Sequence, residues 1–152
     1  AVDFQGRYYR ARNCLLSPRG PSAGGPPIWV GARGDRMLRI IARHGDAYHA
    51  IWPITPEQVA AQRARLDAAC REVGRDPATL DLTVGTFVRL PVDGRPADDD
   101  KAISGTHEAI AARLRAFADL GVRHLTITFR PGLNLRTIEA FAPVLAILDR
   151  EG

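Results

Sequence analysis

The sequence predicts an α/β fold of the (β/α)8, or TIM-barrel, class, with this chain supplying about four βα units, half of such a barrel. Along residues 28–152, four apolar stretches of strand character alternate strictly with stretches of helical periodicity, which is typical of a parallel sheet covered by helices. Small or polar residues such as Gly85 and Thr126 occupy one face of the last two predicted strands. That pattern is typical of a face that looks into a barrel with a polar mouth, whereas a small open doubly wound sheet, the alternative, normally carries aliphatic residues on both faces.

The composition fits one globular domain. Of the 152 residues, 45% are hydrophobic and 25% are charged, which is enough apolar material for one ordinary core. We expect residues 1–27 to form an extended segment and then a loop, because Gly and Pro are frequent in their second half, and residues 28–152 to form the half-barrel. Tyr8 and Tyr9 are expected to cover an edge of the core, although paired tyrosines can also line a pocket.

The first βα unit contains the most informative turn of the chain. A strand is predicted over residues 28–31 and a helix over residues 35–44, and Gly31 and Gly34 allow the backbone between them to turn tightly. The first N–H groups of the helix would point above the strand, where the helix dipole and nearby arginines favour an anion such as phosphate. The same pattern also occurs in ordinary βα turns that hold no ligand.

The second unit begins with a strand over residues 46–51, which ends before Pro53. The helix that follows has a well-marked start, because Thr55 stands at the N-cap position and Gln58 at the third helical position completes a capping box. Pro56 at the first helical position fits the same assignment. Gly74 is expected to end this helix.

The last two units have strands over residues 82–90 and 124–129, both with an alternating apolar pattern. A helix is predicted between them, from the residue after Thr106 to the residue before Gly121. The final helix is expected over residues 135–150, with a kink at Pro143.

A polar surface loop is predicted over residues 91–100, and it ends in Asp98, Asp99 and Asp100. A run of carboxylates forms a metal site only when its surroundings are rigid. We therefore expect a solvated turn here and no metal site.

Charge and cysteine content exclude several classes of protein. The formal net charge is +4, but the arginines are scattered and not interleaved with aromatic residues, so a nucleic-acid partner is not expected. No apolar run reaches the roughly 18 residues of a membrane span. Cys14 and Cys70 lack the spacing of metal ligands and indicate free thiols in a reducing compartment, so we expect a cytoplasmic protein.

Five phrases, in this order and spacing, carry a resemblance to a known family. They lie at residues 4–9 (FQGRYY), 26–31 (PPIWVG), 37–49 (MLRIIARHGDAYH), 74–77 (GRDP) and 103–106 (ISGT). On these phrases the chain resembles the C-terminal half, strands five to eight, of the luciferase-like monooxygenase superfamily, the barrel oxidoreductases that depend on flavin or deazaflavin. The resemblance covers nearly the whole chain.

The resemblance implies a cofactor, either FMN or the deazaflavin coenzyme F-420, across the carboxyl-terminal mouth of the barrel, with a small organic molecule as substrate. The wording around residues 75–77 and 29–32 is closer to the deazaflavin branch. The cofactor phosphate would be held by backbone N–H groups of the turn already described, at Gly31, Ala32, Arg33 and Gly34. Most relatives have a second glycine where this chain has Ala32, so the phosphate grip is expected to differ slightly.

The resemblance also assigns roles to three residues at the ends of later strands. His49 and Trp52 would face the cofactor or the substrate, although His49 could equally be an inward-facing histidine with a hydrogen-bond partner inside the protein. Arg130 would bind an anionic group of the substrate or cofactor, although a lone surface arginine at this position would be unremarkable.

No residue is assigned a catalytic role, because the acid and base residues of such enzymes come from the first four strands. The chain begins without Met, which fits a fragment or a processed protein, and alone it is expected to be inactive or weakly active. An N-terminal half-barrel or a second copy of the chain would be needed to enclose a pocket. The alternative function is a non-catalytic half-barrel that associates with itself and binds a phosphate-bearing ligand.

Overall fold

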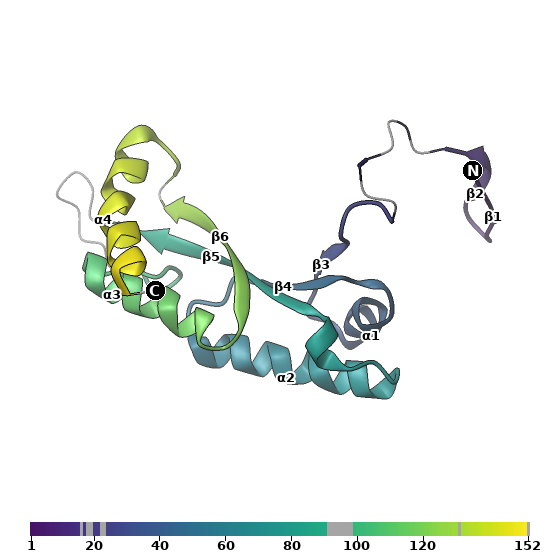
Figure 1. Ribbon diagram of the computed structural model, residues 1–152, viewed down its shortest axis with the longest axis horizontal. Helices are drawn as coiled ribbons and strands as arrows, with labels where there is room; N and C mark the ends of the chain where they lie inside the picture. The colour runs from purple at the N-terminus through teal and green to yellow at the C-terminus, as the bar shows by residue number, and fades with distance from the viewer. Residues whose placement is uncertain (16, 18–19, 22–23, 91–98, 131, 152) are drawn as a thin grey trace.

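Among the residues that the structure describes, two separate sheets, four α-helices and one short 3-10 helix make up the fold (Figure 1). The computed structural model describes residues 1–152 except 16, 18–19, 22–23, 91–98, 131 and 152. The elements in chain order are β1 (Val2–Gln5), β2 (Arg10–Cys14), β3 (Trp29–Gly31), α1 (Asp35–His44), β4 (Ala47–Ile51), α2 (Pro56–Glu72), the short 3-10 helix η1 (Pro77–Thr79), β5 (Asp81–Arg89), α3 (His107–Ala118), β6 (Val122–Arg130) and α4 (Leu135–Glu151).

The main sheet has four strands in the order β3-β4-β5-β6, and every neighbouring pair is parallel. This arrangement confirms the four predicted βα units, with strand boundaries that move by only one or two residues. Because sequential strands are neighbours and each is followed by a helix, all four carboxyl ends lie along one edge of the sheet. The predicted loop over residues 91–98 lies outside the described residues.

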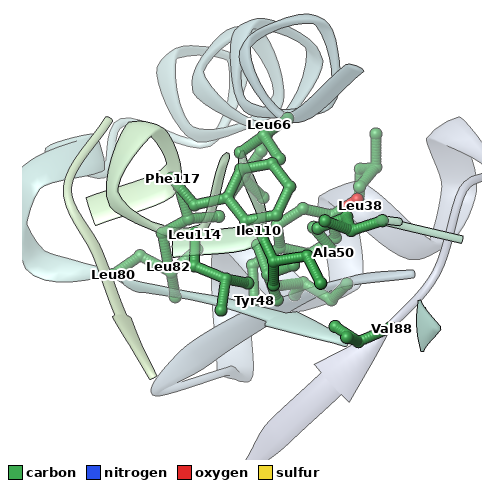
Figure 2. Packing of buried hydrophobic residues seen from close by; sticks show 14 of the residues in the cluster. Leu38, Tyr48, Ala50, Leu66, Leu80, Leu82, Val88, Ile110, Leu114 and Phe117 are labelled. Carbon is green, nitrogen blue, oxygen red and sulfur yellow. The ribbon is translucent and has the colours of Figure 1, made fainter. Parts of the chain in front are cut away.

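Helices cover one face of this sheet, the outer face, and the core lies between them and the strands. Tyr48, Ala50 and Leu82 point from the strands into this core, where they meet Leu66 of α2 and Phe117 of α3 (Figure 2). On β6, apolar residues alternate with exposed His124, Thr126 and Thr128, which lie on the opposite, inner face. The one-sided core therefore leaves the inner face without a covering layer from the described residues, as the sequence predicted for the inside of a barrel.

Local chain chemistry accounts for where the helices begin. Thr55 caps α2: its side chain accepts a hydrogen bond from the Gln58 amide at 3.4 Å, and the Gln58 side chain accepts one from the Thr55 amide at 3.3 Å. This reciprocal pair confirms the predicted capping box. Thr106 caps α3 in the same way, through the amide of Ala109. Pro143 lies inside α4, which continues past it to Glu151.

Residues 1–14 differ from the sequence expectation, because they form an antiparallel hairpin rather than one extended piece. In Figure 1 the hairpin lies apart from the main sheet and its helices. Tyr8 and Tyr9 sit between its two strands and are 77% and 79% exposed, so the expectation that they cover a core edge is wrong. A two-stranded hairpin buries little apolar surface, and for this reason its pairing is hard to foresee from local pattern.

The capping box gives a direct test of this account. We expect Thr55→Ala to lower the free energy of unfolding by about 1 kcal/mol, because it leaves an amide of the first turn of α2 without its acceptor. Urea unfolding followed by circular dichroism measures the loss. Thr55→Ser keeps the hydroxyl and should retain most of the stability, and equal losses for the two variants would contradict the assignment.

Candidate functional site

The turn between β3 and α1 lies at the carboxyl edge of the sheet, where TIM-barrel enzymes carry their active sites. Gly34 is the N-cap residue of α1, and no side chain caps the helix. The Gly34 carbonyl accepts hydrogen bonds from the amides of Met37 and Leu38, at 2.9 and 3.0 Å. The amides of Asp35 and Arg36, the first two helical residues, have no partner within their own helix, so they remain available to an anion.

Space and charge at this turn both suit a phosphate. A β-carbon built on Gly34 would meet no atom within 4 Å, so the backbone there is openly accessible. Arg33 and Arg36 are exposed beside it. Asp35 adds a negative charge in the first turn of α1, but its carboxylate forms an ion pair of 2.6 Å with Arg65 of α2, which offsets that charge.

Hydrogen bonds connect this turn to the core and to the end of β4. The buried side chain of Tyr48 places its hydroxyl within hydrogen-bond distance of the Ala32 carbonyl, at 3.0 Å, and of the Gln62 side-chain oxygen, at 3.1 Å. Burial raises the pKa of this hydroxyl, an effect opposed by Arg65 and Arg33, so it stays a proton donor. Arg33 donates a hydrogen bond of 2.7 Å to the Ile51 carbonyl, which connects the turn to the end of β4.

His49 lies on the inner face and is half-buried, next to the same edge. Its Nδ1 is 2.8 Å from the Thr83 hydroxyl, and its Nε2 lies so close to Gly85 that an added β-carbon would stand 2.6 Å from it. Burial, and to a lesser degree the neighbouring His124, lower the pKa of His49 below its ordinary value of 6.5. The ring is therefore neutral at pH 7. The structure shows the inward-facing histidine with a hydrogen-bond partner inside the protein, and the expectation that His49 faces the cofactor or substrate stays a prediction.

Trp52 follows the last residue of β4 and has an unusual backbone. Its φ is +53°, in the left-handed region, where few residues other than glycine are found. Its amide donates to the Gly85 carbonyl at 2.9 Å, and its indole ring stacks on Phe87 with a centroid distance of 4.4 Å and an interplanar angle of 16°. Trp52 is 45% exposed, so part of its ring faces solvent.

Arg130 is the last residue of β6 and does not stand alone on the surface. Its guanidinium carbon lies 5.3 Å from the centre of the Phe87 ring, and its Nε lies 3.2 Å from the carboxylate of Asp99. The same carboxylate oxygen lies 3.8 Å from Arg89. Arg130 is therefore not a lone arginine, and its role at an anionic group stays a prediction.

Asp99 corrects the expectation of a solvated acidic turn. Its side chain is only 9% exposed, because Arg89 and Arg130 enclose it. The segment after it is fixed to β5, since the Ile103 amide donates to the Phe87 carbonyl at 2.8 Å and the Arg89 amide donates to the Ile103 carbonyl at 2.9 Å. Sequence reasoning missed Asp99 because the partners of a carboxylate in a loop depend on tertiary placement.

The structure brings the predicted site residues together in two groups along one edge. Gly31, Ala32, Arg33 and Gly34 lie at β3 and adjoin Trp52 through the contact of Arg33 with β4. Arg130 lies at β6, three strand spacings or about 14 Å from β3. Phe87 on β5 bridges from Trp52 to Arg130, and it lies two residues after Gly85, so strand alternation places it on the same, inner face.

Three further observations concern other parts of the molecule or other kinds of site. A hollow of about 500 Å³ lies at the opposite, amino-terminal edge of β5 and β6, where Asp81 and Arg123 form an ion pair across its lining. Within the part of the chain that the structure describes, no three His, Cys, Asp or Glu residues are arranged to hold a metal ion. No helix among the described residues is long and apolar enough to cross a membrane.

Comparison with known protein families identifies the family of this chain. The sequence model of the family described as luciferase-like monooxygenase matches residues 1–98, more than half of the chain. The chain belongs to the luciferase-like monooxygenase family. The matched residues include the turn, His49, Trp52 and Phe87, whereas Asp99 and Arg130 lie beyond them.

Among individual members of this family, a phthiodiolone/phenolphthiodiolone dimycocerosates ketoreductase from Mycobacterium sp. (strain JLS) is 34% identical over 99 residues, which cover 65% of this chain and 25% of the relative. A solved F420-dependent secondary alcohol dehydrogenase, in complex with an F420-acetone adduct, superposes with a TM-score of 0.72 at 14% identity, covering 97% of this chain and 56% of that one. A riboflavin lyase with modified FMN and riboflavin superposes with a TM-score of 0.70 at 16% identity, covering 99% and 48%.

These likenesses establish the fold as part of a (β/α)8 barrel of the luciferase-like type. The chain spans about a quarter of the length of the ketoreductase and about half of each solved chain.

The lowered pKa of His49 predicts a pH dependence of stability. In the unfolded chain His49 binds its proton near pH 6.5, and in the folded protein it does so only at lower pH. The free energy of unfolding should therefore fall as the pH drops below about 6.5, because the unfolded state takes up the proton first. NMR titration of the ring and urea unfolding between about pH 7 and pH 5 test this, and His49→Gln should reduce the slope. A His49 titration midpoint above 6.5 would contradict the prediction.

The contact between His49 and Gly85 predicts a second effect. Gly85→Ala places a methyl group against the imidazole, so the ring must move away from Thr83, and we expect a loss of about 1–3 kcal/mol of stability. The displaced ring should also titrate closer to pH 6.5. Gly24→Ala is the matched control, because its new methyl group would meet no atom within 4 Å. If Gly85→Ala left both the free energy of unfolding and the titration of His49 unchanged, the packing of His49 on Gly85 would contribute to neither.

Proposed function

We propose that this chain is the C-terminal, cofactor-phosphate-binding half of an oxidoreductase that uses reduced FMN or coenzyme F-420 for hydride transfer to, or oxygenation of, a small organic substrate. The observation that carries the proposal is the uncapped, open start of α1 at the carboxyl edge of the sheet, in a chain that belongs to the luciferase-like monooxygenase family. The fold supports the same conclusion, because such an edge is where barrel enzymes bind their ligands.

The turn fits the phosphate of such a cofactor. Gly34 leaves the approach to the helix amides open, and the α1 dipole favours negative charge at this position. Arg33 and Arg36 supply positive charge nearby, while the carboxylate of Asp35 is paired with Arg65. Ala32 contributes its carbonyl to Tyr48, which fixes the turn before any ligand arrives.

When bound, the conjugated ring of the cofactor supplies the redox chemistry, and the protein positions it and excludes water. The inner-face residues would contact the ring or the substrate: His49 as a neutral hydrogen-bonding group and Trp52 as a flat apolar surface. Arg130 would bind an anionic group of the substrate. Acid and base residues would come from the other half of the barrel, so we expect these 152 residues alone to have little activity.

Both cofactors have support in the comparisons. One structural neighbour is F420-dependent and another binds modified FMN, and either cofactor carries the phosphate that the turn requires. The free thiols of Cys14 and Cys70 support a reducing compartment, and we propose the cytoplasm.

The decisive variant is Gly34→Val in the native protein that contains this chain. The valine side chain enters open space and leaves the fold intact, but it would obstruct the helix amides. We expect the affinities for FMN and for F-420, measured by fluorescence titration, to fall by about tenfold or more, since charge-assisted hydrogen bonds are lost.

Gly24→Val serves as the control for that experiment, because Gly24 also has nothing within 4 Å and lies outside the turn. Gly31→Val is a poorer test, because its β-carbon would press on the Ile51 side chain at 3.2 Å and disturb the sheet. Unchanged cofactor affinity in Gly34→Val would remove the phosphate-turn proposal.

A second candidate function rests on the uncovered inner face. β3 and β6 are the edge strands of the described sheet, and Trp29 and Trp52 are about half exposed. A surface of this kind favours association, either with the other half of a barrel or with a second copy that would close eight strands. Sedimentation of the 152-residue chain tests self-association, and a well-folded monomer at all concentrations would contradict it.

A further inference from the structure

We propose that Tyr48 is a positioning residue of the turn between β3 and α1: its hydroxyl holds the Ala32 carbonyl and so directs the backbone N–H of Arg33 toward a bound phosphate. The inference deepens the proposed function and rests on it, because it names the group that prepares the turn for the phosphate of FMN or F-420. It adds to that site a residue of β4, which lies outside the turn itself.

The hydroxyl of Tyr48 stands at the end of a side chain that the core holds in place. The residue is 1% exposed, and its ring packs within the buried cluster (Figure 2). Its oxygen lies 3.0 Å from the carbonyl oxygen of Ala32, the first residue after β3. Because a side chain packed on all sides keeps one rotamer, the hydroxyl has a fixed position. The direction of the Ala32 carbonyl is therefore set from the core.

The single proton of this hydroxyl belongs to the Ala32 carbonyl. A second oxygen, on the side chain of Gln62 in α2, lies 3.1 Å from the hydroxyl. If the Gln62 amide is turned over, its nitrogen donates to the hydroxyl, and both contacts form with one phenolic proton. Among the described residues, the Ala32 carbonyl accepts no hydrogen bond other than the one from Tyr48. Loss of the hydroxyl would therefore release this carbonyl.

The peptide bond between Ala32 and Arg33 passes this restraint to a donor. In a trans peptide the C=O group and the N–H group that follows lie in one plane and point in opposite directions. With the carbonyl turned toward Tyr48 in the core, the N–H of Arg33 points away from the core. In the part of the chain that the structure describes, no backbone acceptor is bonded to this N–H. It therefore joins the amides of Asp35 and Arg36 as a donor for an anion.

The side chain of Arg33 supports the same orientation. Its Nη2 donates to the carbonyl of Ile51 at 2.7 Å, so β4 holds the turn at two points, the main chain at Ala32 and the side chain at Arg33. The approach to the turn stays open, because a β-carbon on Gly34 would meet no atom within 4 Å. A donor that is oriented before the ligand arrives lowers the entropic cost of binding. Tyr48 thus contributes to phosphate affinity without touching the phosphate.

Tyr48→Phe in the native protein that contains this chain removes the hydroxyl and retains the buried ring. The probes are FMN with riboflavin, and F-420 with its phosphate-free deazariboflavin, and the pair that the unaltered protein binds more tightly is used. Phosphate selectivity is the ratio of the two affinities in that pair, measured by fluorescence titration. We expect Tyr48→Phe to lower this ratio by about threefold to tenfold, and to leave the affinity for the phosphate-free probe unchanged. An unchanged ratio would overturn the positioning role.

Two control variants separate positioning from the general loss of a buried hydrogen bond. Thr86→Val on β5 removes a buried hydroxyl that donates to the Pro53 carbonyl at 2.6 Å, and it should leave phosphate selectivity unchanged. Gln62→Met removes the second partner of Tyr48 but leaves the phenolic proton for Ala32, so we expect a change in selectivity of less than about twofold. A loss in either control as large as that in Tyr48→Phe would overturn the proposal.

The proposed function and the positioning role fail in different ways. If the unaltered protein binds the phosphate-bearing and phosphate-free probes equally, the turn does not bind phosphate, and the role of Tyr48 is overturned with it. If Gly34→Val loses the selectivity while Tyr48→Phe retains it, the turn binds phosphate but Tyr48 does not position it. Phosphorus NMR of the bound probe adds a spectroscopic measurement: its resonance should move toward that of the free probe in Tyr48→Phe and should not move in Thr86→Val.

Discussion

The arrangement depends on one constraint: a parallel sheet is buried by its helices on one face only. Tyr48, Leu82, Val84 and their neighbours fill the outer side, and burying these side chains supplies most of the stabilising free energy. The inner side is then free to carry histidines, threonines and glycine, which contribute little to a core. Because every strand runs in the same direction, the residues that follow the strands gather at a single edge, and this edge holds all the candidate site residues.

β5 has a special place within that constraint. It lies between β4 and β6, and it supplies the residues on which its neighbours rely: Thr83 pairs with His49, Gly85 makes room for its ring, and Phe87 stacks with Trp52 and Arg130. The side chain that is absent at Gly85 matters as much as those that are present. A single strand thus sets the position of candidate site residues that belong to the two neighbouring βα units.

Local sequence pattern was sufficient for the elements that local chemistry dictates. The capping residue Thr55, the glycines around α1 and the alternation along β5 each specify structure within a few residues, and their predictions are confirmed. The turn at Gly34 was predicted from the glycines and the helical periodicity after them, and the resemblance to luciferase-like enzymes added the cofactor phosphate. Whether the turn and the inner-face residues hold a cofactor stays a prediction.

What escaped prediction depends on contacts between distant segments. Asp99 was expected in solvent, yet two arginines from different strands bury it, and nothing within its own acidic run indicates them. The hairpin of residues 2–14 was expected as a single extended piece, because four- and five-residue strands carry too short a pattern to reveal their pairing. The positive φ of Trp52 likewise arises from packing on Phe87 and from the Gly85 carbonyl, neither of which is near in sequence.

The hydroxyl of Tyr48 couples the turn to the core in a further sense. Its ring is part of the buried cluster, while its oxygen meets the Ala32 carbonyl and the side chain of Gln62 on α2. A movement of the turn at Ala32 therefore disturbs the hydrogen bond of Tyr48, whose ring is buried in the core. Turns of this kind usually belong to the regions that open first, but this one is hydrogen-bonded to a residue of the buried core. Because the core already orders this turn, the turn would lose little conformational entropy when a ligand binds to it.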